Sequence, residues 1–172
     1  MLIIFSILDK INLSLEKKIS IGIRVTPSVV FYSIVEETEK EYITHVIDKV
    51  NVPSALLKPE QLKFIRNTFL DIIEEFNISL ACVRITESSA QVTNVTRIGI
   101  EAVIQELFAS SSITLYYAGQ ISSITTKLGI QRDEFKPLAD GSKVYKKFDN
   151  WKQLSNESRE SILSAFSALN LN

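Results

Sequence analysis

Cysteine and histidine are nearly absent from this sequence of 172 residues, which holds one of each, Cys82 and His45. A single cysteine excludes an internal disulfide, and one cysteine with one histidine excludes a Cys/His zinc site within one chain. The five glycines do not form the glycine-rich loop that cradles phosphates in nucleotide-binding proteins. The apolar neighbours of Cys82 predict a core residue. His45 has no nucleophile motif near it, so we interpret it as structural.

The sequence also lacks an excess of positive charge and a long apolar run. It holds 19 lysines and arginines against 20 acids, for a formal net charge of −1. Proteins that hold duplex DNA through many phosphates usually carry a local or global positive excess, so any nucleic-acid role would rest on a patch. The apolar residues 1–8 are shorter than a membrane span and lack the features of a signal peptide. We therefore expect a cytoplasmic protein without a membrane span.

What remains is typical of one globular domain, with 45% hydrophobic and 23% charged residues. We assign residues 18–172 to that domain. Residues 1–17 form an amphipathic N-terminal extension in this interpretation. We expect the extension to pack on the domain or to join two copies as a homodimer.

The hydrophobic pattern predicts three strands followed by alternating helices and strands. Strict alternation over residues 18–25 and β-branched runs over 29–36 and 42–50 indicate an antiparallel meander. The next elements are expected at 59–76 (helix), 78–85 (strand), 91–110 (helix), 113–117 (strand), 121–128 (helix) and 155–169 (helix), with a polar, irregular loop over 131–150. This order predicts an α/β fold, with a mixed five-stranded sheet flanked by helices.

Two short sequences add a resemblance to this element order. Ile-Gly-Ile-Arg at residues 21–24 and Arg-Ile-Gly-Ile-Glu-Ala-Val-Ile-Gln at 97–105 resemble the RuvC-like branch of RNase H-like proteins. More closely, with Arg84 and Glu87 near the fourth strand, the chain resembles a small bacterial family of unknown function in that superfamily. The resemblance spans residues 18–169 and implies the RNase H-like fold.

Active members of the superfamily hold two divalent metals with carboxylates from the first strand, the fourth strand and the last helix. The resemblance places Arg24 at the first of these positions, and a permanent cation there would repel a metal. Glu87 fits the fourth-strand position, and Glu157 and Glu160 are candidates on the last helix. Glu101, on the neighbouring helix, is a compensating acid. If the site binds Mg²⁺ or Mn²⁺, Glu87 and Glu160 are the expected ligands; otherwise we expect no cofactor.

Simpler interpretations of the same charges stay open. Arg24 is either a phosphate-binding residue of a retired active site or an exposed strand residue paired with Glu87 or Glu101. Arg97 and Glu101 have the spacing of an ordinary helical surface pair. The two acids of the last helix also suit the positive end of a helix dipole, which alone would explain them.

Lysines and aromatic residues alternate in the late loop. Aromatic rings can stack on bases while nearby lysines contact phosphates, although the four acids in this stretch also fit an ordinary charged loop. The candidate binding residues are Arg24, Arg84, Arg97, Lys143, Lys146, Lys147 and Trp151.

Three functional hypotheses follow. The first is an RNase H-like domain with a degenerate active site that binds nucleic acid or a protein partner. The second is a divergent metal-dependent nuclease or resolvase that uses Glu87, Glu101 and either Glu157 or Glu160. The third is a structural or regulatory subunit with no ligand of its own.

Overall fold

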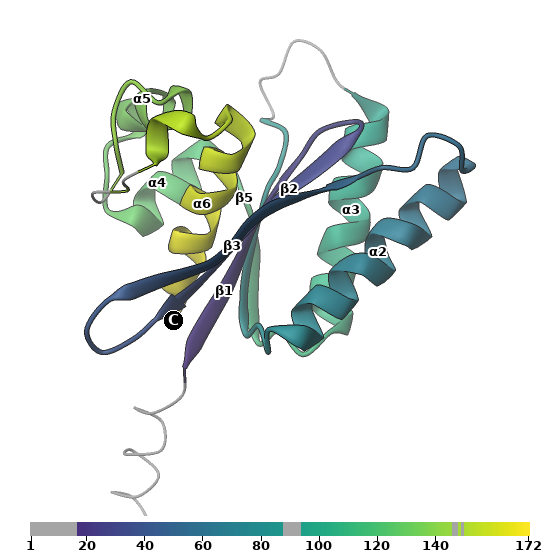
Figure 1. Cartoon of the computed structure of the whole chain (residues 1–172), viewed down its shortest axis with the longest axis horizontal. Coiled ribbons are helices and arrows are strands. Elements are labelled where there is room, and N and C mark those ends of the chain that lie inside the picture. The colour runs from purple at the N-terminus through teal and green to yellow at the C-terminus, as the bar shows by residue number, and fades with distance from the viewer. Residues whose placement is uncertain (1–16, 88–93, 146–147, 149) are drawn as a thin grey trace, which may run out of the picture.

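Five strands form one mixed sheet in the order β3-β2-β1-β4-β5 (Figure 1). They are β1 (Lys18–Val25), β2 (Val29–Glu37), β3 (Tyr42–Asn51), β4 (Leu80–Arg84) and β5 (Leu115–Gly119). The first three strands pair antiparallel, whereas β1, β4 and β5 run parallel to one another. This computed structural model describes residues 17–87, 94–145, 148 and 150–172. The predicted meander and mixed five-stranded sheet are confirmed.

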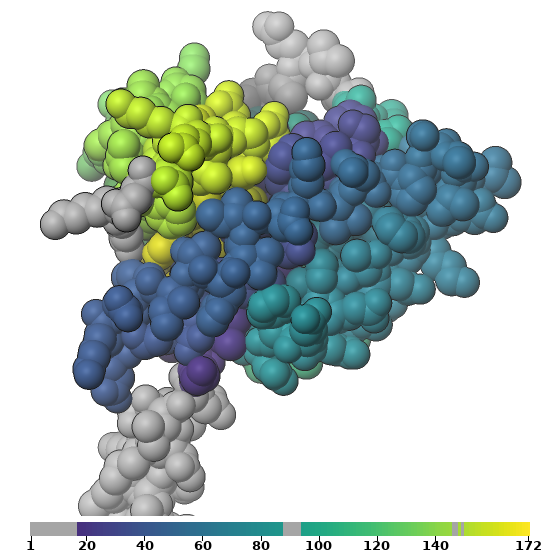
Figure 2. All heavy atoms as spheres, viewed as in Figure 1, coloured from purple at the N-terminus to yellow at the C-terminus, as the bar shows by residue number. Residues whose placement is uncertain are grey.

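Helices cover both faces of the sheet. They are α2 (Lys58–Glu75), α3 (Val95–Ser110), α4 (Ile121–Leu128), α5 (Phe135–Asp140) and α6 (Asn156–Leu169), with short 3₁₀ turns η1 (Arg132–Glu134) and η2 (Trp151–Gln153). In Figure 1, α2 and α3 lie on one side of the sheet, and α4, α5 and α6 lie on the other. Figure 2 shows the β2–β3 hairpin crossing the surface between these two groups.

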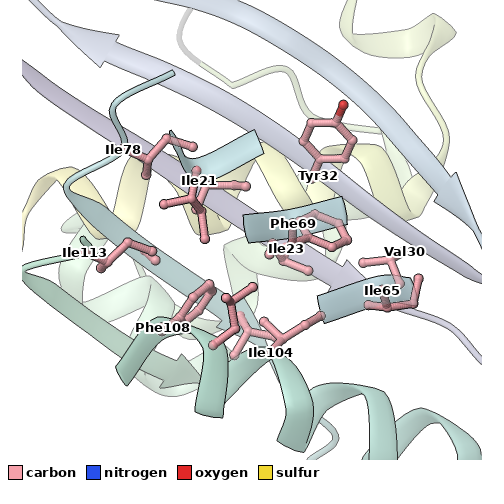
Figure 3. Close-up of a cluster of buried hydrophobic side chains, with 14 of the residues drawn as sticks. Ile21, Ile23, Val30, Tyr32, Ile65, Phe69, Ile78, Ile104, Phe108 and Ile113 are labelled. Carbon is pink, nitrogen blue, oxygen red and sulfur yellow. The ribbon is translucent and has the colours of Figure 1, made fainter. Parts of the chain in front are cut away.

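The alternation of β1 assigns its side chains to two different cores. Ile21 and Ile23 point toward α2 and α3, where they join a buried cluster that includes Phe69 and Phe108 (Figure 3). Val25 belongs to the same cluster. Successive residues of a strand face opposite sides of the sheet. The intervening residues of β1 therefore face α6.

On that second face, β1 and α6 approach so closely that no side chain fits between them at Gly22. A Cβ atom there would lie 2.0 Å from the carbonyl oxygen of Ser161 and 2.1 Å from the amide nitrogen of Ala165. The Ser20 hydroxyl, one strand position earlier on this face, donates to the Ala165 carbonyl at 2.9 Å. Small residues on both elements thus hold α6 against the centre of the sheet.

Helix α6 is buried along most of its length. Its apolar residues Ile162, Leu163, Phe166 and Leu169 are all buried. Serines are buried as well, and the Ser161 hydroxyl lies 2.7 Å from that of Ser33 on β2. The helix therefore belongs to the centre of the domain.

Two sequence predictions about single residues are confirmed. Cys82 is fully buried, and burial raises the pKa of its thiol to about 11. His45 has a structural contact, because its Nε2 lies 2.7 Å from the buried carboxylate of Glu36. The hydrogen bond from His45 and a second one from Lys17 hold the pKa of Glu36 below its usual range.

The late loop differs from the expectation of irregular structure over residues 131–150. Its first half forms η1 and α5, because Phe135, Leu138 and Ala139 have the spacing of a helical face and are buried. Polar neighbours concealed this short apolar pattern in the sequence.

No helix among the described residues is long and apolar enough to cross a membrane. The N-terminal extension, apart from Lys17, lies outside the described residues. Its role in a homodimer and the domain boundary at residue 18 stay predictions.

Candidate functional site

Two arginines lie side by side at the carboxyl ends of the central strands. Arg24 is the penultimate residue of β1 and Arg84 is the last residue of β4, and the two are register partners in the parallel pair. Arg24 has the same strand parity as Ser20 and Gly22, so both guanidinium groups lie on the α6 side of the sheet.

A carboxylate from α6 meets both arginines. Glu160 Oε2 lies 2.6 Å from Arg24 Nε and 3.6 Å from Arg84 Nε. One of the two interpretations of Arg24, an exposed strand residue paired with Glu87 or Glu101, is wrong. Its side chain is 15% exposed and pairs with Glu160, because strand alternation turns it toward α6.

Glu87 contacts a different nitrogen of the Arg84 guanidinium group from the one that Glu160 contacts. Its Oε1 lies 3.0 Å from Arg84 Nη2 and accepts a hydrogen bond at 2.9 Å from the backbone N–H of Ile121, in the first turn of α4. The Arg84 guanidinium also lies over the ring of Phe135, 5.8 Å from its centroid. Arg84 therefore connects β4 with α5 and α6.

Glu101 completes the group from the side of α3. Arg97 Nε contacts its Oε1 at 2.6 Å, and Thr86 donates to it through both its backbone N–H and its hydroxyl, each at 3.2 Å. The predicted Arg97–Glu101 pair is confirmed, but it is not a surface pair, since Glu101 is only 4% exposed. Thr86 was not a candidate in the sequence, although its position between β4 and Glu87 placed it at this edge.

These six side chains form what we call the Arg–Glu cluster: Arg24, Arg84, Arg97, Glu87, Glu101 and Glu160. It holds three charges of each sign. Burial lowers the pKa of Arg24, Glu160 offsets part of that effect, and the nearby Arg97 and Arg84 add to it. An arginine in a protein nevertheless stays protonated, so the cluster keeps its cations in close proximity.

A shallow depression of about 520 Å³ adjoins the cluster at the start of α4. Ile121, whose N–H binds Glu87, forms one side of it. The remaining lining residues are Gln131, Arg132, Asp133 and Lys136. Two exposed cations therefore lie within this depression, against one acid.

Solved structures with the same architecture exist despite low sequence identity. RuvC of Thermus thermophilus matches with a TM-score of 0.65 and 11% identity, covering 87% of this chain and 92% of that one. The same protein in complex with Holliday junction substrate matches with a TM-score of 0.63 and 11% identity, over 87% and 91% of the two chains. The chain has the RuvC-like form of the RNase H-like fold.

A viral protein shares this RNase H-like fold. Fowlpox virus resolvase in complex with substrate Holliday junction DNA matches with a TM-score of 0.51 and 12% identity, covering 88% of this chain and 96% of that one. No family model and no curated protein sequence matches the chain. The narrower resemblance to a small bacterial family therefore stays a prediction.

The side chains at the strand ends of this RNase H-like fold do not suit a divalent metal. Mg²⁺ requires several oxygen ligands in octahedral geometry. Within residues 17–87, 94–145, 148 and 150–172, no group of three or more acidic, histidine or cysteine side chains could hold a metal ion. The two expected metal ligands, Glu87 and Glu160, instead contact the same guanidinium group of Arg84.

None of the other candidates that the structure describes takes part in the Arg–Glu cluster. Glu157 stands in the first turn of α6, and no ion pair of it occurs in the described part of the chain. Lys143 is exposed and pairs with Glu134, while Lys146 and Lys147 lie outside the described residues. The prediction that Trp151 stacks on bases is wrong. Its ring is fully buried and its Nε1 donates to the Leu138 carbonyl at 3.0 Å.

Proposed function

We propose that this chain is a non-catalytic RNase H-like domain that binds nucleic acid through its phosphates. The observation that carries the proposal is the pairing of Arg24 with Glu160 at 2.6 Å, at the position where the resemblance expects the first catalytic acid. A guanidinium group there provides a cation in place of a metal ligand.

The pairing of every carboxylate in the Arg–Glu cluster supports a degenerate active site. Glu87, Glu101 and Glu160 each contact an arginine. A metal entering the cluster would have to displace these cations and would be repelled by them at short range. Two-metal hydrolysis needs carboxylates that converge on the metals as ligands.

The surrounding charges support phosphate binding. Arginine forms bidentate contacts with phosphate oxygens, and the adjoining depression adds Arg132 and Lys136. RuvC and fowlpox resolvase, which share the fold, are described in complexes with Holliday junction DNA. Because the chain carries a net charge of −1, binding would depend on this patch. Lys143, Lys146 and Lys147 stay candidate phosphate contacts.

The test combines binding and cleavage in the same samples. Fluorescently labelled branched DNA, RNA–DNA hybrid and single-stranded DNA are mixed with the protein in EDTA or in Mn²⁺. Anisotropy gives the affinity, and denaturing gels of the same samples give cleavage. We expect binding that is independent of the metal, that weakens steeply as salt rises, and that leaves the nucleic acid intact.

Matched variants locate the binding surface. Arg132→Ala and Lys136→Ala should each weaken binding and reduce the salt slope by about 1, because each removes one phosphate contact. Lys63→Ala, on the exposed side of α2, should leave both quantities unchanged. Metal-dependent cleavage abolished by Glu87→Gln would establish the nuclease hypothesis instead. Absence of binding to the whole panel at low salt would leave a protein partner or a structural role.

A further inference from the structure

Glu160 occupies the part of the Arg–Glu cluster where a phosphate group would bind. Its Oε2 atom approaches the Nε atoms of both Arg24 and Arg84, which come from neighbouring parallel strands. Two guanidinium groups from adjacent strands around one oxyanion form the arrangement that recognises phosphate.

The carboxylate neutralises these two arginines without satisfying them. Arg24 Nε, Arg84 Nε and Glu160 Oε2 are buried, and none of them has a hydrogen-bond partner of good geometry in the described part of the structure. Arg84 is only 5% exposed. Buried donors usually have partners. An oxyanion with oxygen atoms in other directions would bond these two Nε–H groups in better geometry, provided that the Glu160 carboxylate leaves.

The other two carboxylates are held more firmly than Glu160. A backbone N–H fixes Glu87 through Ile121, and another fixes Glu101 through Thr86. For Glu160, the contacts found among the described residues are with the two arginines alone. Its side chain is 16% exposed, and the displacement proposed below takes a change of its side-chain rotamer.

We propose that Glu160 is a built-in competitor for phosphate, and that a phosphate group of the ligand displaces its carboxylate from Arg24 and Arg84. This inference rests on the proposed function and adds its regulation. With Glu160 displaced, three arginines face two carboxylates, and one phosphodiester charge restores neutrality. Wild-type affinity is thereby kept low, and ligands that present phosphate in the right geometry are selected.

A pair of variants on α6 isolates this competition. Glu160→Gln removes the competing charge, whereas Glu157→Gln removes an equal charge one turn earlier, away from the arginines. The two variants have the same net charge, so general electrostatic attraction affects them equally. We expect Glu160→Gln to bind labelled single-stranded DNA about tenfold more tightly than wild type, and Glu157→Gln to stay within about twofold.

A third variant keeps the test decisive if Glu160→Gln unfolds, because it retains the charge that the buried arginines need. Glu160→Asp shortens the side chain by one methylene and withdraws the carboxylate from the guanidinium groups. We expect it to bind about threefold more tightly than wild type. Thermal unfolding of all three variants identifies any loss of fold.

The phosphate that displaces Glu160 comes either from a free anion or from a nucleic-acid backbone, and a titration with inorganic phosphate distinguishes the two. Calorimetric titration of phosphate into wild type and Glu160→Gln shows whether a free anion suffices, and the DNA measurement shows whether a nucleic-acid backbone is needed. Tighter binding of either probe by Glu160→Gln supports the displacement. Equal affinities of the Glu160 and Glu157 variants for both probes overturn it. If the displacement is overturned but the wild type binds DNA, the proposed function stands. If Glu160→Gln binds phosphate more tightly than wild type and neither protein binds DNA, the displacement stands for a free anion and the proposed function fails. If neither probe binds wild type or Glu160→Gln, both fail.

Discussion

Replacing Gly22 with alanine tests the close approach of α6 to β1. By local propensity alone, alanine is better than glycine within a strand or helix by roughly 0.5–1 kcal/mol. The packing gives the opposite sign, because the new Cβ would lie 2.0 Å from the Ser161 oxygen and 2.1 Å from the Ala165 nitrogen. Comfortable contacts of this type need about 3.5 Å. Helix α6 would therefore have to retreat by roughly 1.5 Å from the strand.

The magnitude follows from what the retreat disturbs. Overpacking a core costs about 1–3 kcal/mol, and both obstructing atoms here are helix backbone, which cannot rotate away. We therefore expect a loss of about 3 kcal/mol. For a domain of this size, 1 kcal/mol shifts the Tm by about 2–4 °C, so the Tm of Gly22→Ala should fall by about 6–12 °C.

Thermal unfolding followed by circular dichroism provides the measurement, with Gly99→Ala as the control. Gly99 lies within α3, and a Cβ atom there meets nothing within 4 Å. Its replacement should raise the Tm by about 1–4 °C. If Gly22→Ala also raises the Tm or leaves it unchanged, β1 and α6 do not approach as described.

Two further predictions concern titratable groups. Hydrogen bonds from His45 and Lys17 lower the pKa of Glu36. The ionised Glu36 carboxylate therefore stabilises the fold fully above the unfolded-state pKa, about 4.3. This stabilisation is lost as the pH falls through the lowered folded-state pKa. Glu36→Gln should therefore lower the urea midpoint at pH 7 and flatten the decline of that midpoint toward pH 3. Glu39→Gln, in the exposed turn, should keep the wild-type pH profile. A decline in Glu36→Gln as steep as that of the wild type would contradict this account. Burial raises the pKa of the Cys82 thiol to about 11, so its reaction with a disulfide reagent at pH 8 should be slow and should accelerate only with unfolding. Complete labelling of the folded protein within seconds would refute the burial.

The periodicity of the sequence was sufficient for most of the fold. Alternation in β1 and the meander that follows depend on local apolar patterning, which the sequence displays directly. Helix α4 was predicted at the residues where it occurs, because Gly129 adopts the left-handed conformation that ends it. Helix α5 was missed because a helix of six residues shows its apolar face over less than two turns.

The sequence predicted which residues make up the Arg–Glu cluster but not which of them pair with each other. The six members were all candidates, yet the partner of Arg24 was wrong. Strand parity directs Arg24 toward α6, and the pairing spans more than a hundred residues, a distance over which no local pattern operates. Trp151 was misassigned for a related reason. An aromatic residue among lysines has the same sequence pattern whether its ring is buried or exposed.

The contact between Ser20 and Ala165 joins residues 145 positions apart. Ribosomes add about 5–20 residues per second, so Ser20 is synthesised roughly 7–30 s before Ala165. During that interval one face of the central strands has no covering helix from α6, and an exposed apolar sheet face of this kind is prone to aggregation. We therefore expect the face of the sheet that packs on α2 and α3 to be covered before the face that packs on α6.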